Sequence, residues 1–170
     1  MPDEALVALA ERLQGVCLGR GLPVAAAESC TGGLIGAAIT SVPGSSGYFL
    51  GAVVAYADAA KGALLGVPTA TLEAHGAVSA QAAMAMATGA RERLEAALAV
   101  SVTGIAGPDG GSPAKPVGLT YIGLAAPSGV EVRRLVLAGD RAAVREAAAA
   151  AALAWLIEVA EVAGPEAPSA

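Results

Sequence analysis

Large aromatic side chains are scarce in this chain of 170 residues. Phe, Tyr and Trp together make up 3% of it, although 55% of the residues are hydrophobic, so alanine supplies most of the apolar content. A core of such small side chains has to form by close approach of helices and strands. We expect one domain over residues 1–163 and a disordered tail over 164–170.

Histidine and cysteine are equally rare, which limits the chemistry available. The single histidine, His75, excludes any site that needs two imidazoles, and a Ser–His pair would have to use it. The two cysteines, Cys17 and Cys30, have no metal-ligand spacing. Neither residue type therefore points to a metal site, and we expect no cofactor.

Basic clusters and long apolar runs are also missing. The net charge is −5, and no group of basic residues is larger than the pair Arg133 and Arg134, whereas nucleic-acid binding needs a basic face. The longest apolar run, 147–157, is shorter than the roughly 20 residues of a membrane span, and no leader-peptide pattern opens the chain. We expect a cytoplasmic protein without nucleic-acid or membrane partners.

Helical and strand patterns alternate along the chain. Helical spacing is expected over 3–20, 29–39, 57–65, 79–97 and 140–162, and strands over 22–28, 49–56, 98–102, 117–125 and 130–137. Pro127-Ser128-Gly129 predicts an antiparallel hairpin between the last two strands. This order predicts an α/β fold, a three-layer α/β/α sandwich with a mixed parallel and antiparallel sheet.

Polar residues follow three of these strands at the point where each one ends. Ser29, Tyr56 and Thr103 all occupy such positions. Ligands of open α/β sheets bind at the carboxyl edge of the strands. We therefore expect the three residues to share one site.

Ser29 opens a turn that leads into a helix. Free N–H groups at that helix start would stabilise an anion or an oxyanion beside Ser29, and Gly32 and Gly33 would permit close approach of a ligand. The alternative is that Ser29 or Thr31 only caps the helix. Cys30 is a rival nucleophile, although no histidine is next to it in the sequence.

Lys61 is one of only two lysines, with Lys115, in a chain that contains eight arginines. Lysine, unlike arginine, can lose its proton near neutral pH when it is buried. A neutral lysine is a known activator of a nucleophilic serine. The alternative is a solvated surface lysine beside Asp58.

Two further features point to an anionic ligand. The loop 103–111 contains four glycines and either forms an anion-binding nest or is simply rich in turns. Arg141 and Arg145, at the start of the last helix, would bind a phosphate in a bidentate manner or form surface ion pairs.

Seven short motifs taken together resemble the CinA C-terminal domain family, from about residue 4 to residue 160. They are Ala-Glu-Ser-Cys-Thr-Gly-Gly (27–33), Pro-Gly-Ser-Ser (43–46), Tyr56 with Lys61, Gly-Ala-Val-Ser (76–79), Gly-Ile-Ala-Gly-Pro-Asp-Gly-Gly (104–111), Lys-Pro-Val-Gly (115–118) and Gly-Asp-Arg (139–141). Enzymatically active members of this family are nicotinamide-nucleotide amidases. The family also includes longer proteins with an additional N-terminal domain. This sequence does not contain that domain and resembles the stand-alone form.

The resemblance implies hydrolysis of the carboxamide of nicotinamide mononucleotide to nicotinic acid mononucleotide and ammonia. It implies a metal-free site in which Ser29 is the nucleophile and Lys61 the base, with Tyr56 nearby to relay a proton or orient the lysine. We expect the remaining site residues to bind substrate. Thr103 and Gly104 would contact the ribose or phosphate, and Arg141 or Arg145 the phosphate. The other substrate-binding candidates are Cys30, Thr31, Gly32, Gly33 and Ser45.

Other interpretations stay open at this point. If Ser29 only caps a helix, the chain would be a non-catalytic nucleotide-binding module of the competence/damage-inducible type. A third interpretation is a hydrolase that acts through Cys30. Alanine-rich helical faces and an exposed sheet edge favour a homo-oligomer, with a dimer expected first.

Overall fold

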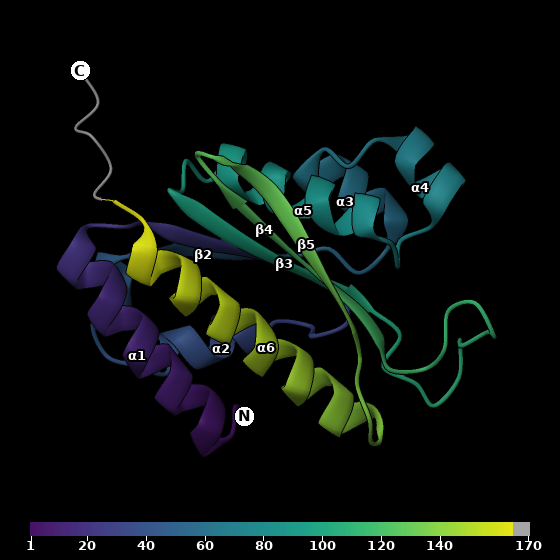
Figure 1. Cartoon of the computed structure of the whole chain (residues 1–170), viewed down its shortest axis with the longest axis horizontal. Coiled ribbons are helices and arrows are strands. Elements are labelled where there is room, and N and C mark those ends of the chain that lie inside the picture. The colour runs from purple at the N-terminus through teal and green to yellow at the C-terminus, as the bar shows by residue number, and fades with distance from the viewer. Residues whose placement is uncertain (165–170) are drawn as a thin grey trace.

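A five-stranded mixed sheet forms the middle layer of the computed structural model, which describes residues 1–164 (Figure 1). The strands are β1 (Val24–Glu28), β2 (Phe49–Val54), β3 (Leu98–Gly104), β4 (Leu119–Ala126) and β5 (Gly129–Val136). The disordered tail predicted over 164–170 falls, from residue 165 onward, outside the described residues.

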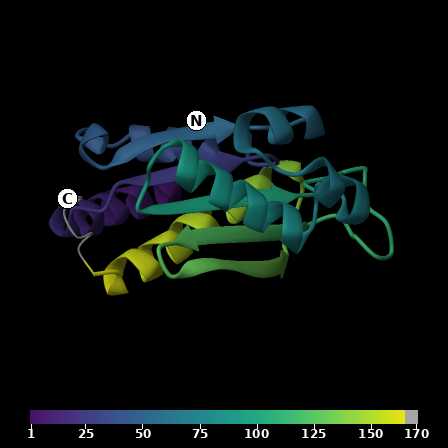
Figure 2. The same ribbon diagram turned by 90° about the horizontal axis from the view of Figure 1, so that it is seen from above.

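The strand order is β2-β1-β3-β4-β5. β1 pairs in parallel with both β2 and β3, whereas β4 is antiparallel to β3 and to β5. Figure 2 shows β2 at one edge of the sheet and the β4–β5 hairpin at the other. Because β1, β2 and β3 run in one direction, their carboxyl ends meet at the same edge, and this edge carries the site described below.

Helices cover both faces of the sheet, which confirms the predicted three-layer sandwich (Figure 1). One layer contains α1 (Glu4–Arg20), α2 (Leu34–Thr40) and α6 (Arg141–Val162), and the other contains α3 (Asp58–Leu65), α4 (Thr69–His75) and α5 (Ala80–Arg93). A short 3-10 turn, Ser45–Gly47, precedes β2. No helix within residues 1–164 combines the length and apolarity needed to cross a bilayer.

Side-chain caps determine where the long helices begin. The carboxylates of Asp3 and Asp140 accept hydrogen bonds from Leu6 N–H (2.8 Å) and Ala143 N–H (2.9 Å), and Ser79 Oγ accepts one from Ala82 N–H (3.1 Å). These bonds satisfy donors that have no partner inside the helix. The predicted helix starts at these three positions are therefore confirmed.

Two predictions about the elements need correction. α5 ends at Arg93 rather than near residue 97, and β3 extends to Gly104, so that Thr103 lies within the strand. The helix α4 was not predicted. None of its residues is buried, so it has no apolar periodicity that a sequence pattern would detect.

Small residues allow the layers to approach closely, as the alanine-rich composition suggests. At Gly89 of α5, a Cβ atom would lie 1.9 Å from the carbonyl oxygen of Leu65 in α3. At Gly123 of β4, it would lie 2.5 Å from the carbonyl oxygen of Ala83 in α5. Backbone therefore packs on backbone on this side of the sheet, and α3 is held at a distance that no larger residue permits.

We predict that Gly89→Ala destabilises the protein, because the added methyl group must push α3 away from α5. Overpacking of this kind costs about 1–3 kcal/mol. Gly15→Ala is the matched control, since Gly15 lies in a helix with nothing within 4 Å of the added Cβ. There alanine should increase stability by about 0.5–1 kcal/mol. Urea unfolding followed by circular dichroism measures both, and equal stability of the two variants would contradict the packing argument.

Candidate active site

A cavity of about 180 Å³ opens at the carboxyl edge of the parallel strands. Its walls come from both helical layers and from the loops after β1, β2 and β3. The lining residues are Ser29, Cys30, Tyr56, Lys61, Ala77, Val78, Thr103, Gly104, Ala106 and Arg141. The structure thus brings Ser29, Tyr56 and Thr103 together, as their positions at strand ends indicate.

Ser29 follows the last residue of β1 in a turn that is not yet helical. α2 begins at Leu34, and its N-cap is Gly33, which has φ 99° and provides no side-chain cap. Capping by Ser29 or Thr31 is therefore wrong as an explanation of these residues. Ser29 is 8% exposed and lies in the cavity wall.

Glu28 holds the turn behind Ser29, a role that the sequence reasoning missed. Its side chain is fully buried, and its carboxylate accepts hydrogen bonds from Thr31 Oγ1 (2.7 Å) and from the N–H groups of Gly33 (2.9 Å), Ile35 (3.2 Å) and Gly36 (2.9 Å). These bonds occupy the helix-start donors that we expected to face Ser29. The expectation is wrong for those N–H groups, and only the earlier amides of the turn remain available.

Lys61 is the largest buried side chain of the cavity, with 1% exposure. Its Nζ donates a hydrogen bond of 2.7 Å to the carbonyl oxygen of Tyr56 and lies 4.0 Å from Asp58 Oδ1. A solvated surface lysine is therefore wrong as an interpretation. The helix α3 carries Lys61 inward from the layer opposite to α2, so that serine and lysine reach the cavity from different elements.

Burial lowers the pKa of Lys61 from its ordinary value of 10.5. Desolvation penalises the ammonium form, while Asp58, Cys30 and Tyr56 partly oppose the shift by favouring positive charge. The direction is the one that a general base requires, because only the neutral amine has a lone pair with which to accept a proton.

The rival groups are less suited to nucleophilic chemistry. Burial raises the pKa of the Cys30 thiol to about 11, although backbone N–H groups of Cys30 and Thr31 and the charge of Arg145 lower it in part. The thiol is thus held protonated near neutral pH. His75 is exposed at the end of α4 and does not line the cavity. A Ser–His pair is therefore excluded.

Thr103 connects the floor of the cavity to the segment before α5. Its Oγ1 donates a hydrogen bond of 2.8 Å to the carbonyl oxygen of Ala77. Ala77 and Val78 were not predicted as site residues, although they belong to the Gly-Ala-Val-Ser motif at 76–79. Ala106 was also missed, and its position two residues after Gly104 was the available signal.

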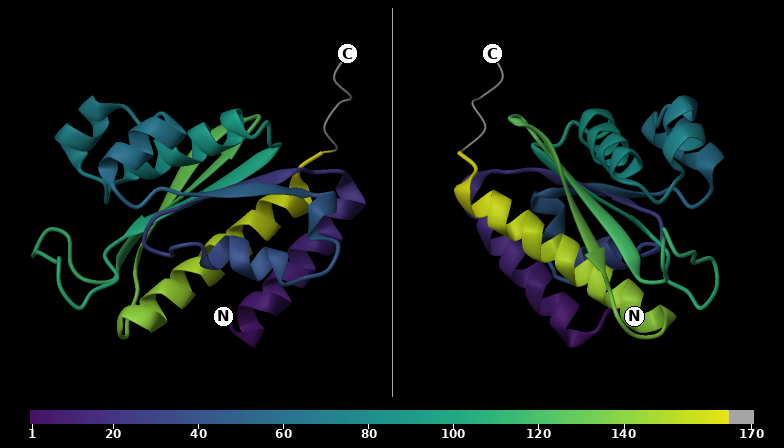
Figure 3. Two further views of the ribbon diagram at one scale, coloured as in Figure 1. Left: turned by 180° about the vertical axis from the view of Figure 1, so that it is seen from behind. Right: turned by 45° about the vertical axis from the view of Figure 1, so that its right-hand side comes forward.

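Arg141 lies at the entrance of the cavity. Its guanidinium donates hydrogen bonds to the carbonyl oxygen of Gly107 (2.8 Å) and to the hydroxyl of Tyr56 (3.3 Å). Tyr56 is 63% exposed. Its carbonyl oxygen accepts the hydrogen bond from Lys61, and its hydroxyl accepts the one from Arg141. Figure 3 shows the loop between β3 and β4, which contains Gly107, projecting from the body of the molecule.

Five predicted site residues are not among those that line the cavity. Thr31, Gly32 and Gly33 lie behind Ser29 in the turn, and Arg145 binds the carbonyl oxygens of Cys30 (3.1 Å) and Thr31 (2.9 Å). Ser45 lies before β2, near the start of β1, where the Tyr48 carbonyl accepts from Val24 N–H. The length of β1, about 16 Å at about 3.3 Å per residue, separates that end of the sheet from Ser29. The role of these residues in substrate binding stays a prediction.

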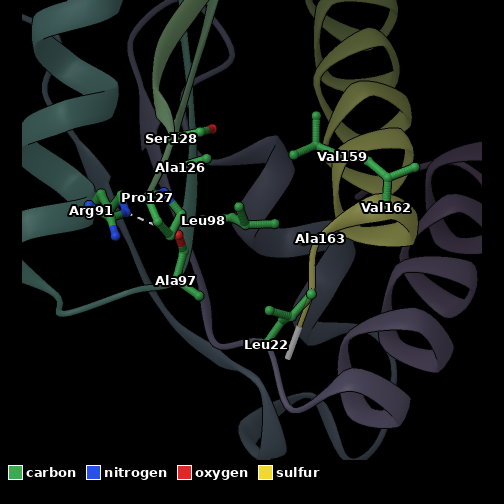
Figure 4. A pocket seen from close by; sticks show the side chains of 11 residues that line it. Leu22, Arg91, Ala97, Leu98, Ala126, Pro127, Ser128, Val159, Val162 and Ala163 are labelled. Atoms are coloured by element: carbon green, nitrogen blue, oxygen red, sulfur yellow. Dashed lines mark hydrogen bonds between the residues drawn. The ribbon is translucent and has the colours of Figure 1, made fainter. Parts of the chain in front are cut away.

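A larger cavity, of about 630 Å³, lies at the opposite end of the sheet. Figure 4 shows Val159 and Val162 of α6 on one side of it and Leu98 of β3 on the other, with Arg91 bonded to the carbonyl of Ala97. Its walls are mainly apolar and contain neither of the two lysines. The presence of Ser29 together with a buried lysine therefore distinguishes the smaller cavity.

Comparison with known proteins identifies the family of this chain. A family model described as the CinA C-terminal domain matches residues 6–160. The CinA-like protein of Geobacter sulfurreducens is 56% identical over 137 residues, which are 81% of this chain and 33% of that protein. The CinA-like protein of Citrifermentans bemidjiense is 51% identical over 136 residues, with 80% and 33% coverage. This chain thus spans about a third of the length of these relatives.

Solved structures match over nearly the whole chain. The competence/damage inducible protein CihA from Agrobacterium tumefaciens has a TM-score of 0.90 at 43% identity, covering 94% of this chain and 98% of that one. A competence-damaged protein (CinA) superfamily protein from Escherichia coli has a TM-score of 0.88 at 31% identity, covering 94% and 93%. Sequence, fold and motifs agree, and the chain belongs to the CinA C-terminal domain family.

Proposed function

We propose that this chain is an amidohydrolase that converts nicotinamide mononucleotide to nicotinic acid mononucleotide and ammonia. The observation that carries the proposal is the presence of Ser29 and a buried Lys61, whose pKa is lowered, in one small cavity. The resemblance of the motifs to nicotinamide-nucleotide amidases supplies the substrate. The names of the relatives state no reaction, so the activity is a proposal.

In the first half of the reaction, neutral Lys61 takes the proton of the Ser29 hydroxyl while Oγ bonds to the carboxamide carbon. The electron pair of the C=O π bond moves to oxygen and forms an oxyanion. When the intermediate collapses, the carbon–nitrogen bond breaks and the Lys61 ammonium returns its proton to the leaving nitrogen, which departs as ammonia. The hydrogen bond from Nζ to the Tyr56 carbonyl orients the amine during this exchange.

In the second half, water attacks the serine ester. Lys61 accepts a proton from the water and delivers it to Ser29 Oγ as that oxygen leaves. The immediate product is the carboxylic acid, which loses a proton to the solvent to give the carboxylate of nicotinic acid mononucleotide, and the enzyme returns to its starting state. No step requires a metal or an oxidant.

The dimensions of the cavity suit one end of a nucleotide. Pockets that enclose a drug-sized ligand have volumes of about 300–1,000 Å³, whereas this cavity has about 180 Å³. The pyridine ring with its carboxamide would enter, and the ribose and phosphate would remain near Thr103, Gly104 and the exposed Arg141 at the entrance.

We predict that Ser29→Ala and Lys61→Met each reduce ammonia release by at least about a thousandfold. Lys61→Met retains the length of the buried side chain and removes the amine, so loss of the fold is not expected. Lys115→Met is the matched control, because Lys115 is the only other lysine and does not line the cavity. Near wild-type turnover by either active-site variant would exclude the mechanism.

The same assay separates the competing functions. Binding of nicotinamide mononucleotide by the wild-type protein without any ammonia release would favour a nucleotide-binding module. Inactivation by iodoacetamide would favour Cys30, whereas we expect insensitivity because this thiol is buried and its pKa is about 11. Free nicotinamide and NAD as alternative substrates would establish the specificity.

We predict that Asp58→Asn moves the acid limb of the pH profile of kcat/KM toward lower pH. Activity rises as Lys61 loses its proton, and Asp58 raises the pKa of Lys61 by stabilising the ammonium. Removing this charge lowers the pKa further, and solvent weakens the effect because the Asp58 side chain is 62% exposed. Glu73→Gln is the control, since Glu73 is not among the groups that shift Lys61. A shift toward higher pH would contradict the assignment of Lys61 as the base.

A further inference from the structure

In the turn from Ser29 to Gly33, three of the five backbone N–H groups donate to oxygen atoms. Ser29 N–H donates to the Val102 carbonyl (3.0 Å), Gly32 N–H donates to the Ser29 carbonyl (3.1 Å), and Gly33 N–H donates to Glu28. Within residues 1–164, the N–H groups of Cys30 and Thr31 donate to no oxygen acceptor. Unpaired amides are rare in buried segments, and Thr31 has no exposed surface.

The side chain of Arg145 determines the orientation of one of these amides. Its Nε donates to the Cys30 carbonyl (3.1 Å) and its terminal nitrogen to the Thr31 carbonyl (2.9 Å). The peptide between Cys30 and Thr31 is trans, so its C=O and N–H point in opposite directions. By holding the Cys30 carbonyl, Arg145 directs the Thr31 N–H to the opposite side of the turn.

Cys30 lines the cavity beside Ser29, whereas Thr31 has no exposed surface and does not line it. The N–H groups of Cys30 and Thr31 both act on the Cys30 sulfur. A thiol is only a weak acceptor, so the Cys30 N–H remains available for a stronger one. An amide next to the nucleophile is placed to stabilise an oxyanion.

Gly32 and Glu28 also help to define the conformation of the turn beside Arg145. Gly32 has φ +61°, and a Cβ there would lie 3.2 Å from the terminal nitrogen of Arg145. Glu28 holds the following amides and the Thr31 hydroxyl from the helix side. A buried carboxylate and a half-buried guanidinium therefore hold the turn from two directions.

We propose that Arg145 is a positioning residue for amide hydrolysis: through the carbonyl oxygens of Cys30 and Thr31 it fixes the turn that carries Ser29 and the Cys30 N–H, and this N–H binds the carboxamide oxygen when Ser29 attacks. The inference rests on the proposed function and assigns Arg145 a role other than phosphate binding. Arg141, which is exposed at the entrance, remains the arginine placed to meet the substrate.

The test is the effect of Arg145→Gln on kcat and KM with two substrates, nicotinamide mononucleotide and its dephosphorylated nucleoside. We expect kcat to fall about tenfold to a hundredfold on both substrates with KM little changed, because a misaligned donor affects the transition state. Arg145→Lys retains the charge without the paired donors and should recover only part of kcat. Arg12→Gln is the control, since it removes an arginine contact to α6 at Glu161, away from the turn.

Each contrary result has a separate meaning. A rise in KM for the phosphorylated substrate alone would make Arg145 a phosphate ligand and overturn the inference, as would unchanged kinetics of Arg145→Gln. Full recovery by Arg145→Lys would also overturn it, because charge alone would then suffice. Absence of ammonia release by the wild-type protein would overturn the proposed function itself. Thermal unfolding of all variants shows whether a loss of kcat reflects a loss of fold.

Discussion

The buried carboxylate of Glu28 is the constraint on which the geometry of the reactive turn depends. It stands at the last position of β1 and accepts hydrogen bonds from one hydroxyl and three backbone amides. A charge without solvent is tolerated only when it is paired in this way. By binding the start of α2 directly, Glu28 fixes the distance between strand and helix and leaves Ser29 in the wall of the cavity.

The proposed base reaches the same cavity from another part of the fold. Lys61 belongs to the opposite helical layer, and its position depends on how closely α3 packs against α5 at Gly89. Ser29 and Lys61 are therefore brought to one cavity by two independent contacts: one between charged and polar groups, the other between small residues. The low aromatic content permits this close packing, because large side chains between the layers would move Lys61 away from Ser29.

Patterns in the sequence predict the elements and the edge at which the site lies, since caps, alternation and strand ends are local signals. They do not predict that Lys61 is buried, because a lone lysine beside an aspartate is more often solvated. They also do not predict the partners of Arg145, because the carbonyl oxygens of Cys30 and Thr31 are about 115 positions away along the chain and no residue type reveals a backbone acceptor. Glu28 was passed over for a similar reason, as the polar end of an apolar strand.

The buried lysine also couples protonation to folding. In the unfolded chain Lys61 has its ordinary pKa of 10.5 and carries a proton, whereas the folded state lowers that pKa. Between the two values the unfolded state binds more protons, so this residue makes the fold more stable as pH rises and less stable as pH falls. Folding therefore releases a proton into the medium in that range. Acid weakens the structure through the same group whose neutral form the proposed reaction requires.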